Sequence, residues 1–318
     1  MIPRALGRSS SSLLVLLALA AGCSSPAPHP YAAPFAAPAA GPAAASGGEW
    51  RTLSEPELEV SARPAPQEAA APEHDAEELA KKLSNPVADL ISVPFQGNYD
   101  SNIGPGDDGN KYYVNIQPVI PIGLDEDWNL ISRTILPVVH QEDVAPGSGT
   151  DNGLGDVTQS LFFSPAKPTE SGLIWGAGPA FLIPTASETE LGAEKWGVGP
   201  TGVVLKQEGH WTMGALANHI WSVAGDDDRA DVSATFLQPF LAYTTKEAWT
   251  YSLNTESTYD WKDEEWSVPI NAFVSKVTRI GDQLVSIGGG LRWWADSPPD
   301  GPEGLGARFF VTLLYPRH

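Results

Sequence analysis

Single charges stand within otherwise apolar, strand-like stretches of the chain. Glu256 lies in the middle of "YSLNTESTYDW", and Arg292 and Arg308 lie in similar stretches further on. Arg133 is a fourth charge of this kind, although isoleucines share its set of alternate positions. If these side chains meet on one face, they could select solutes by charge, or they could simply fill a narrow interior with ion pairs. Both interpretations stay open at this stage.

Amide side chains accompany these charges on the same alternate positions. A pleated strand sends successive side chains to opposite faces, so the charges and the amides are expected to share one face. Such a face carries too many polar groups for a dry core. The candidate residues for this polar face are Asn115, Gln117, Arg133, Asn254, Glu256, Asn271, Arg292 and Arg308.

Signals for catalysis are weak. His219 in "ANHIW" precedes the acidic run Asp226 to Asp228, and a histidine paired with an aspartate could act as a general base. The chain contains no G-x-S-x-G, no H-E-x-x-H and no glycine-rich phosphate loop. The acidic segments do not match a calcium-binding loop, which favours solvated surface charge. We therefore expect a protein that is not an enzyme, with no catalytic residue, no metal site and no cofactor.

The elements that must position these residues are strands. From Asp89 onward no long helical period occurs, and runs of strand type alternate with turn residues. Each run has one apolar and one more polar set of alternate positions. About twelve runs are expected, near 89–97, 111–122, 127–140, 156–164, 172–184, 195–206, 210–223, 231–244, 248–261, 265–278, 283–295 and 305–315.

Three features indicate that the apolar faces point to lipid. Aromatic rings stand at both ends of an apolar face, as in Trp249 and Trp261, which is typical of the girdles of outer-membrane strands. The runs have the length that a tilted strand needs to cross a bilayer. The opposite faces are polar. The sequence therefore predicts an all-β protein, with one transmembrane antiparallel barrel of about twelve strands over residues 89–318.

The connections alternate between longer acidic loops and shorter turns. In outer-membrane barrels the short turns face the periplasm, and an even number of strands brings both ends of the barrel there. We accordingly expect the long loops outside, in contact with outer-membrane lipid and lipopolysaccharide. The small solute and the oligomeric state are left open by the sequence.

The front of the chain has a different composition. Residues 1–22 have the basic and then apolar pattern of a signal peptide, and the apolar run is too short to span a membrane. Cys23 follows a lipobox-like "LAAG", so lipidation competes with ordinary cleavage after Ala20. Residues 23–73 are rich in proline and alanine and predict a disordered tether. Residues 74–88 predict a short helix, either on the surface or plugging the lumen.

Charge and cysteine content exclude two further classes. The net charge of −20 argues against nucleic-acid binding, which requires basic surface. Cys23 is the single cysteine among 318 residues, so the chain has no intramolecular disulfide.

Several stretches between Asn85 and Pro316 also resemble a known family. Among them are "NPVADLISVPFQGNYDSNIGPGD", "YVNIQPVIPIGLDEDWNLISRTILPVV" and "WADSPPDGPEGLGARFFVTLLYP". They look like a bacterial family of outer-membrane β-barrels labelled "transporter" or "neuromedin U", which is similar to the family named for the meta-pathway of phenol degradation. The resemblance implies a porin-like barrel in the outer membrane of a Gram-negative bacterium, and it implies little about the substrate.

Overall fold

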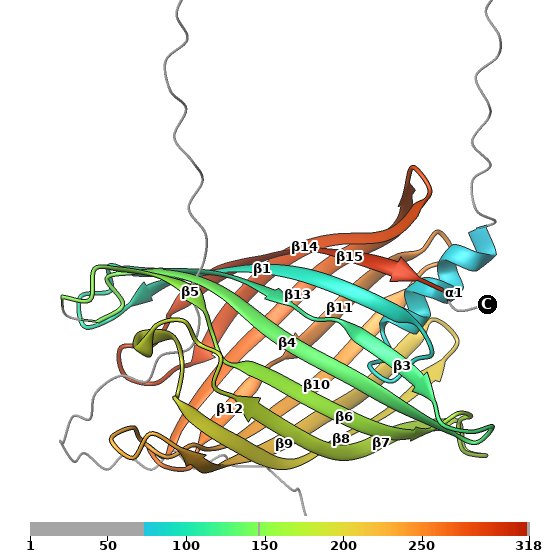
Figure 1. The fold of residues 1–318 in the computed structure, drawn as a ribbon. Coiled ribbons are helices and arrows are strands. Elements are labelled where there is room, and N and C mark those ends of the chain that lie inside the picture. The colour runs from blue at the N-terminus through green and yellow to red at the C-terminus, as the bar shows by residue number, and fades with distance from the viewer. Residues whose placement is uncertain (1–72, 146, 317–318) are drawn as a thin grey trace, which may run out of the picture.

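The computed structural model describes residues 73–145 and 147–316, which form one barrel and a short helix (Figure 1). Fifteen strands make twelve crossings of the barrel wall, because three of the crossings are each interrupted and consist of two consecutive strands. The interrupted crossings are β2 with β3, β5 with β6, and β11 with β12. The elements are α1 (Glu73–Leu83), β1 (Ile91–Ile103), β2 (Gly109–Ile116), β3 (Val119–Gly123), β4 (Trp128–Glu142), β5 (Thr150–Leu154), β6 (Val157–Pro165), β7 (Leu173–Ile183), the 3-10 turn η1 (Thr189–Leu191), β8 (Lys195–Glu208), β9 (Trp211–Gly225), β10 (Ser233–Thr244), β11 (Trp249–Thr255), β12 (Ser257–Asp260), β13 (Glu265–Ile280), β14 (Gln283–Asp296) and β15 (Gly304–Tyr315).

Pairing between the first and last strands closes the barrel. β1 pairs with β15 in antiparallel register, from Ile91 opposite Tyr315 to Tyr99 opposite Ala307. The other neighbouring strands are also antiparallel. Closure leaves no free sheet edge, which is what a sheet needs in a medium without water. The predicted all-β barrel of about twelve strands is confirmed.

Local chemistry explains two of the three interruptions. Pro118 follows β2 and has no N–H for the ladder. Glu256 separates β11 from β12 at a point where the neighbouring strands carry Pro239 and Pro269. Because neither proline can donate a backbone hydrogen bond, the ladder weakens around Glu256. The chain is therefore irregular beside the charge in the middle of "YSLNTESTYDW".

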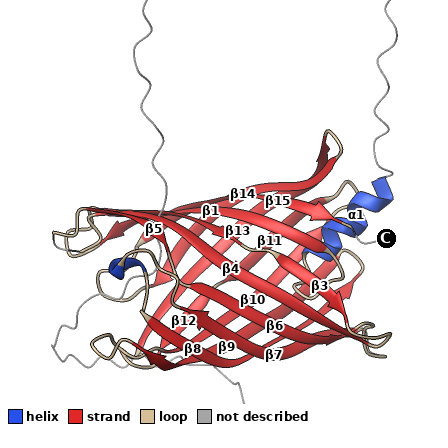
Figure 2. Cartoon of the chain, in the orientation of Figure 1, coloured by secondary structure: helices blue, strands red, loops and turns tan. Residues whose placement is uncertain are grey.

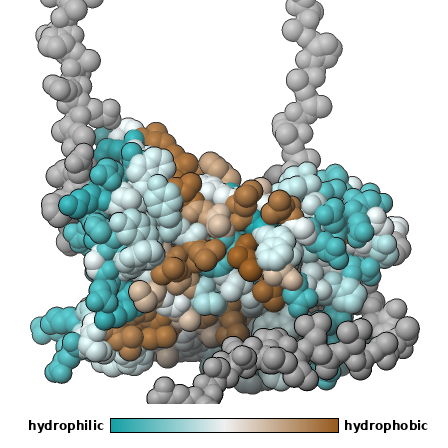
Figure 3. All heavy atoms as spheres, turned by 180° about the vertical axis from the view of Figure 1, so that it is seen from behind, coloured by the Kyte–Doolittle hydropathy of each residue, from teal (hydrophilic) through white to brown (hydrophobic). Residues whose placement is uncertain are grey.

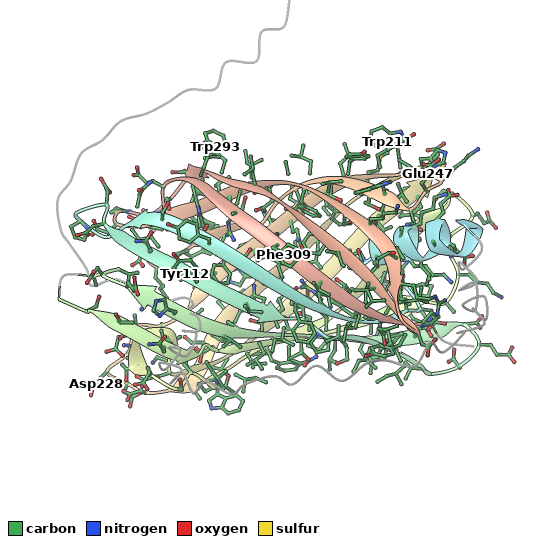
Figure 4. All side chains as sticks on the ribbon, turned by 90° about the horizontal axis from the view of Figure 1, so that it is seen from above. Tyr112, Trp211, Asp228, Glu247, Trp293 and Phe309 are labelled. Carbon is green, nitrogen blue, oxygen red and sulfur yellow. The ribbon has the colours of Figure 1, made fainter. Side chains whose placement is uncertain are left out.

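The outer wall is apolar and carries aromatic rings near both ends. Leu291, Leu305 and Phe309 are among its exposed side chains, and apolar side chains gather in patches on the face in Figure 3. Trp211 and Trp293 project outward near opposite ends of the wall (Figure 4). A soluble barrel would bury such a surface, whereas a lipid-exposed one presents it with aromatic girdles.

The two ends of the barrel differ in their connections. At one end, here called the helix end, are α1, the start of β1 and the end of β15, with the turns 124–127, 166–172, 209–210, 245–248 and 281–282 (Figure 2). At the other, the loop end, the connections are 104–108, 143–149, 184–194, 226–232, 261–264 and 297–303. The even number of crossings brings the first and last strand ends together, as the sequence predicts.

α1 and the segment after it pack inside the helix end. Leu79 and Ala80 of the helix lie in a buried cluster with Val277 and Leu314. Val277 is on the same set of alternate positions of β13 as Asn271, and Leu314 is on the same set of β15 as Arg308, so both side chains point into the barrel. The Gln207 side-chain amide also donates to the Lys81 carbonyl oxygen at 2.8 Å. Of the two predicted arrangements of the helix, the packing corresponds to the lumenal one. The helix itself ends at Leu83, and Pro86 lies in the turn that follows.

Further along the lumen, Val87 adds to the apolar contacts. It packs with Ile131, Phe162, Leu205 and Leu216, which project from the wall of β4, β6, β8 and β9. The segment between α1 and β1 therefore enters the barrel rather than lying across its rim.

The loop 184–194 folds over the loop end. Leu191 of η1 is fully buried against Val139 and near Tyr113. The Asp156 carboxylate accepts three backbone N–H groups of this loop, from Thr185, Ala186 and Ala193, at 2.7–3.1 Å. Together these contacts fix the loop across part of the mouth, although the sequence reads as an acidic outer loop.

Some sequence expectations fall outside the described residues. The signal peptide 1–22, the lipidation of Cys23 and nearly all of the tether 23–73 are of this kind. Within residues 73–145 and 147–316, no helix is long and apolar enough to cross a membrane.

Candidate functional site

A bidentate ion pair lies at the centre of the barrel interior. Two Arg308 nitrogens donate to the two carboxylate oxygens of Glu256 at 2.8 and 2.7 Å, and Nε donates to Asn98 at 2.7 Å. These residues come from β15, the break between β11 and β12, and β1. The planar guanidinium matches a carboxylate in this geometry, so the pair ties distant strands together across the lumen.

A second arginine continues the network toward the loop end. Arg292 on β14 donates to the Tyr113 hydroxyl, and its Nε lies 3.5 Å from Asp100 Oδ1. The indole N–H of Trp294 donates to the same oxygen at 2.9 Å, and the Arg292 guanidinium stacks 4.6 Å from the Trp294 ring centre. The cation thus has both a carboxylate and an aromatic face as partners.

Arg133 lies on the opposite side of the ion pair, toward the helix end. It donates to the Gln117 amide oxygen at 3.1 Å, and the side-chain amides of Gln117 and Gln96 are 3.0 Å apart. Gln238 reaches Glu256 at 3.5 Å. Unlike the other two arginines, Arg133 has no carboxylate within 4 Å among the described residues.

A separate amide pair lies on the neighbouring wall. Asn271 is fully buried and donates to Asn254 at 2.8 Å between β13 and β11. Asn115 lies on β2 opposite Gln96 of β1 and Pro137 of β4. No hydrogen bond joins the Asn115 side chain to the network within the part of the chain that the structure describes.

Tight packing leaves Arg292, Arg308 and Asp100 almost inaccessible to water, whereas the Glu256 side chain is 19% exposed. The side chains of Arg308, Arg292 and Asp100 are 3%, 6% and 2% exposed. Room for this packing comes from small residues: a Cβ at Gly306 would lie 2.4 Å from the Tyr99 carbonyl oxygen and 2.8 Å from Asp100 Oδ1. The site can therefore act on a solute through its fixed charges and its shape. Its charged side chains are held strongly to one another by ion pairs.

The sequence-derived residues fall into three groups. Arg133, Gln117, Glu256, Arg292 and Arg308 come together around the network. Asn254 and Asn271 pair on their own, and Asn115 stands apart. That these candidate residues line a path for a solute stays a prediction.

Sequence reasoning missed six network members: Gln96, Asn98, Asp100, Tyr113, Gln238 and Trp294. The signal was present in "QGNYD", where Gln96, Asn98 and Asp100 occupy alternate positions of β1. That run was expected to end at residue 97, so its polar face was cut short. No local signal could have indicated that Arg292 meets Tyr113, because 179 positions separate them.

His219 lies outside this network. Its Nδ1 is 2.7 Å from the Thr235 hydroxyl, which also accepts the indole N–H of Trp261. Its ring centre is 4.1 Å from that of Trp221. These partners place His219 among the aromatic side chains near the loop end. It occupies the set of alternate β9 positions that faces outward.

The described residues contain no group of three or more histidine, cysteine, aspartate or glutamate side chains that could hold a metal ion.

Comparisons with known proteins support the fold. No family model matches the chain, and no curated protein matches it. Among solved structures, a COG4313 outer-membrane channel from Pseudomonas putida F1 is similar at 15% identity, with a TM-score of 0.56, over 71% of this chain and 94% of that one.

Two further solved structures are less similar. Outer membrane phospholipase A from Escherichia coli has a TM-score of 0.41 at 11% identity, covering 77% of this chain and 99% of that one. A bacterial polysaccharide outer membrane secretin has a TM-score of 0.33 at 10% identity, covering 71% and 99%. The similarity to the channel, together with the closed barrel described above, supports an outer-membrane-type barrel fold. The specific family resemblance described above stays a prediction.

Proposed function

We propose that this protein is an outer-membrane barrel that binds a small solute in its lumen and passes it passively across the membrane. The observation that carries the proposal is the lumen itself, where a charged network and a neighbouring cavity lie within a closed barrel with an apolar outer wall. The similarity in fold to an outer-membrane channel supports it. In such a pore, fixed charges and the local diameter set selectivity.

A closed, structural barrel is the second candidate. The low exposure of Arg292 and Arg308 favours it, as do the segments that pack into both ends. In that case the ion pairs would serve to hold strands together, and any passage would require α1 or the loop 184–194 to move.

Single-channel conductance of the full chain in a planar bilayer tests the proposal. We expect discrete openings whose ion selectivity changes in Glu256→Gln, with Glu78→Gln, on the exposed face of α1, as the matched control. Silence under all voltages and solutes, with heat-dependent gel mobility showing a folded barrel, would instead support the closed barrel.

An enzymatic role is not part of the proposal. A rim hydrolase using His219 would need a nucleophile or a water positioned by that imidazole, and its Nδ1 is engaged by Thr235. Ester hydrolysis that is abolished in His219→Ala, with the barrel still folded, would overturn this position.

A further inference from the structure

A cavity of about 180 Å³ lies between the N-terminal segment and the lumen wall. The chain from Lys82 to Leu90 forms one side of it, and side chains of β1, β3, β4, β9 and β10, together with Gln117, form the other. Its volume slightly exceeds the ~150 Å³ of an engineered apolar cavity that binds benzene. A molecule little larger than benzene therefore fits.

The polar part of this cavity is positively charged. Its lining contains Arg133 and Lys82 and no aspartate or glutamate. Lys82 is paired with Glu78 at 2.9 Å on the exposed face of α1, which leaves Arg133 as the cation that faces the cavity without a carboxylate.

Arg133 has unused capacity to bind an anion. A guanidinium has five N–H donors, and among the described residues one hydrogen bond, to the Gln117 side chain, engages them. The carboxylate that acts on Arg133 electrostatically is Glu256, and Arg308 already holds both of its oxygens. A planar carboxylate from a solute would complete the Arg133 pair in bidentate geometry.

The remainder of the lining has a polar part and an apolar part. Asn85, Ser92, Gln117 and Gln238 form the polar part. Leu83, Leu90, Val119 and Leu216 contribute to the apolar part, and Leu216 and Val119 belong to the cluster around Val87. The apolar part favours a hydrocarbon body and disfavours a second charge against it, because a buried unpaired charge is costly.

We propose that this cavity binds a small monocarboxylate with a short aliphatic body, its carboxylate on Arg133 and its hydrocarbon against Leu90, Val119 and Leu216. This inference rests on the proposed function, because it names the solute class for the same lumen. Binding in this cavity requires both the charge of Arg133 and the apolar contacts.

Calorimetric titration of the full-chain protein in lipid nanodiscs tests the inference, with pentanoate as the probe at pH 7. We expect saturable pentanoate binding, with pentanamide, its neutral analogue, and pentylammonium each at least tenfold weaker. Arg133→Gln should weaken pentanoate binding at least tenfold, whereas Arg279→Gln, at the exposed end of β13, should leave it unchanged.

A second variant keeps the test decisive if Arg133→Gln does not fold. Val119→Phe fills the apolar side and retains the charge, so it should also abolish binding. Equal binding of pentanoate and pentanamide, or full binding in Val119→Phe, would overturn the inference.

The two proposals fail separately. Conductance without pentanoate binding would leave passage standing and remove this solute class. Saturable binding that depends on Arg133, in a barrel that never conducts, would keep the site and overturn passage.

Discussion

Arg308 depends on Glu256 for its burial. Its side chain is 3% exposed, and Glu256 satisfies two of its nitrogens. Removing one partner of a buried ion pair leaves an uncompensated charge, which typically costs about 3–5 kcal/mol. We expect Glu256→Ala to lower the free energy of unfolding by about 3 kcal/mol in denaturant titrations from lipid vesicles, followed by tryptophan fluorescence.

The control for this measurement is Glu78→Ala. Glu78 forms an exposed i,i+4 pair with Lys82, and such pairs contribute about 0.3–0.5 kcal/mol. A Glu256→Ala loss no larger than that of the control would show that the lumenal pair is replaceable by water.

Asp231, in the loop 226–232, provides a prediction about pH. The Ser222 hydroxyl donates to it, and the Lys195 and Lys262 ammonium groups lie 3.5 and 3.7 Å away. The hydrogen bond first, and then the two cations, hold the pKa of Asp231 below its ordinary value.

Because this pKa is lower when folded, the carboxylate stabilises the loop above the unfolded pKa, and the effect is lost as pH falls through the folded pKa. Carboxyl NMR titration should show the pKa of Asp231 rising in Lys262→Gln and unchanged in Lys246→Gln, at the other end. No rise in Lys262→Gln would mean that the Ser222 hydrogen bond and Lys195 lower the pKa of Asp231 without a contribution from Lys262.

At the scale of elements, Asp156 determines whether the loop 184–194 stays over the mouth. Asp156→Ala would leave three backbone N–H groups without their acceptor, and each loss of such a charged hydrogen bond costs about 1.5–3 kcal/mol. We expect faster hydrogen exchange at Ala186 and Ala193 and larger conductance. Glu190→Ala, which changes an exposed charge in the same loop, should alter neither.

At the helix end, α1 provides a prediction about what blocks the lumen. Ala80 is 2% exposed within the cluster around Leu79, so Ala80→Asp would place an unpaired charge there. We expect the helix to leave the barrel, with loss of exchange protection over 76–83 and higher conductance. Unchanged conductance in a variant whose helix has detached would remove α1 as a barrier to passage.

The sequence predicts features that depend on neighbouring residues better than features that depend on contacts between distant segments. Alternation and turn residues are local, so the twelve crossings are predictable from the sequence. The breaks near Pro118 and Glu256 fall within the runs 111–122 and 248–261, which were expected to be continuous. The partners of Arg292 and the burial of Leu191 depend on which strands and loops meet in space. An apolar leucine among the acidic residues of "ETELGAE" was the one local sign that this loop turns inward.

For the whole molecule, the arrangement of the two ends makes a topological prediction. Asp228 and Glu247 lie at opposite ends of the barrel (Figure 4). We propose that the loop end faces outward and the helix end faces the periplasm, because short turns of bacterial barrels are periplasmic. Introducing a cysteine at one of these positions at a time allows a membrane-impermeant thiol reagent to report its side.

On intact cells, Asp228→Cys should react at once, whereas Glu247→Cys should react after the outer membrane is permeabilised. The parent chain, which retains Cys23, gives the background labelling for both. Prompt labelling of Glu247→Cys alone would reverse the orientation, and it would then place α1, the start of β1 and the end of β15 at the cell surface. The direction in which a solute meets the cavity and the charged network is therefore decided by the same experiment.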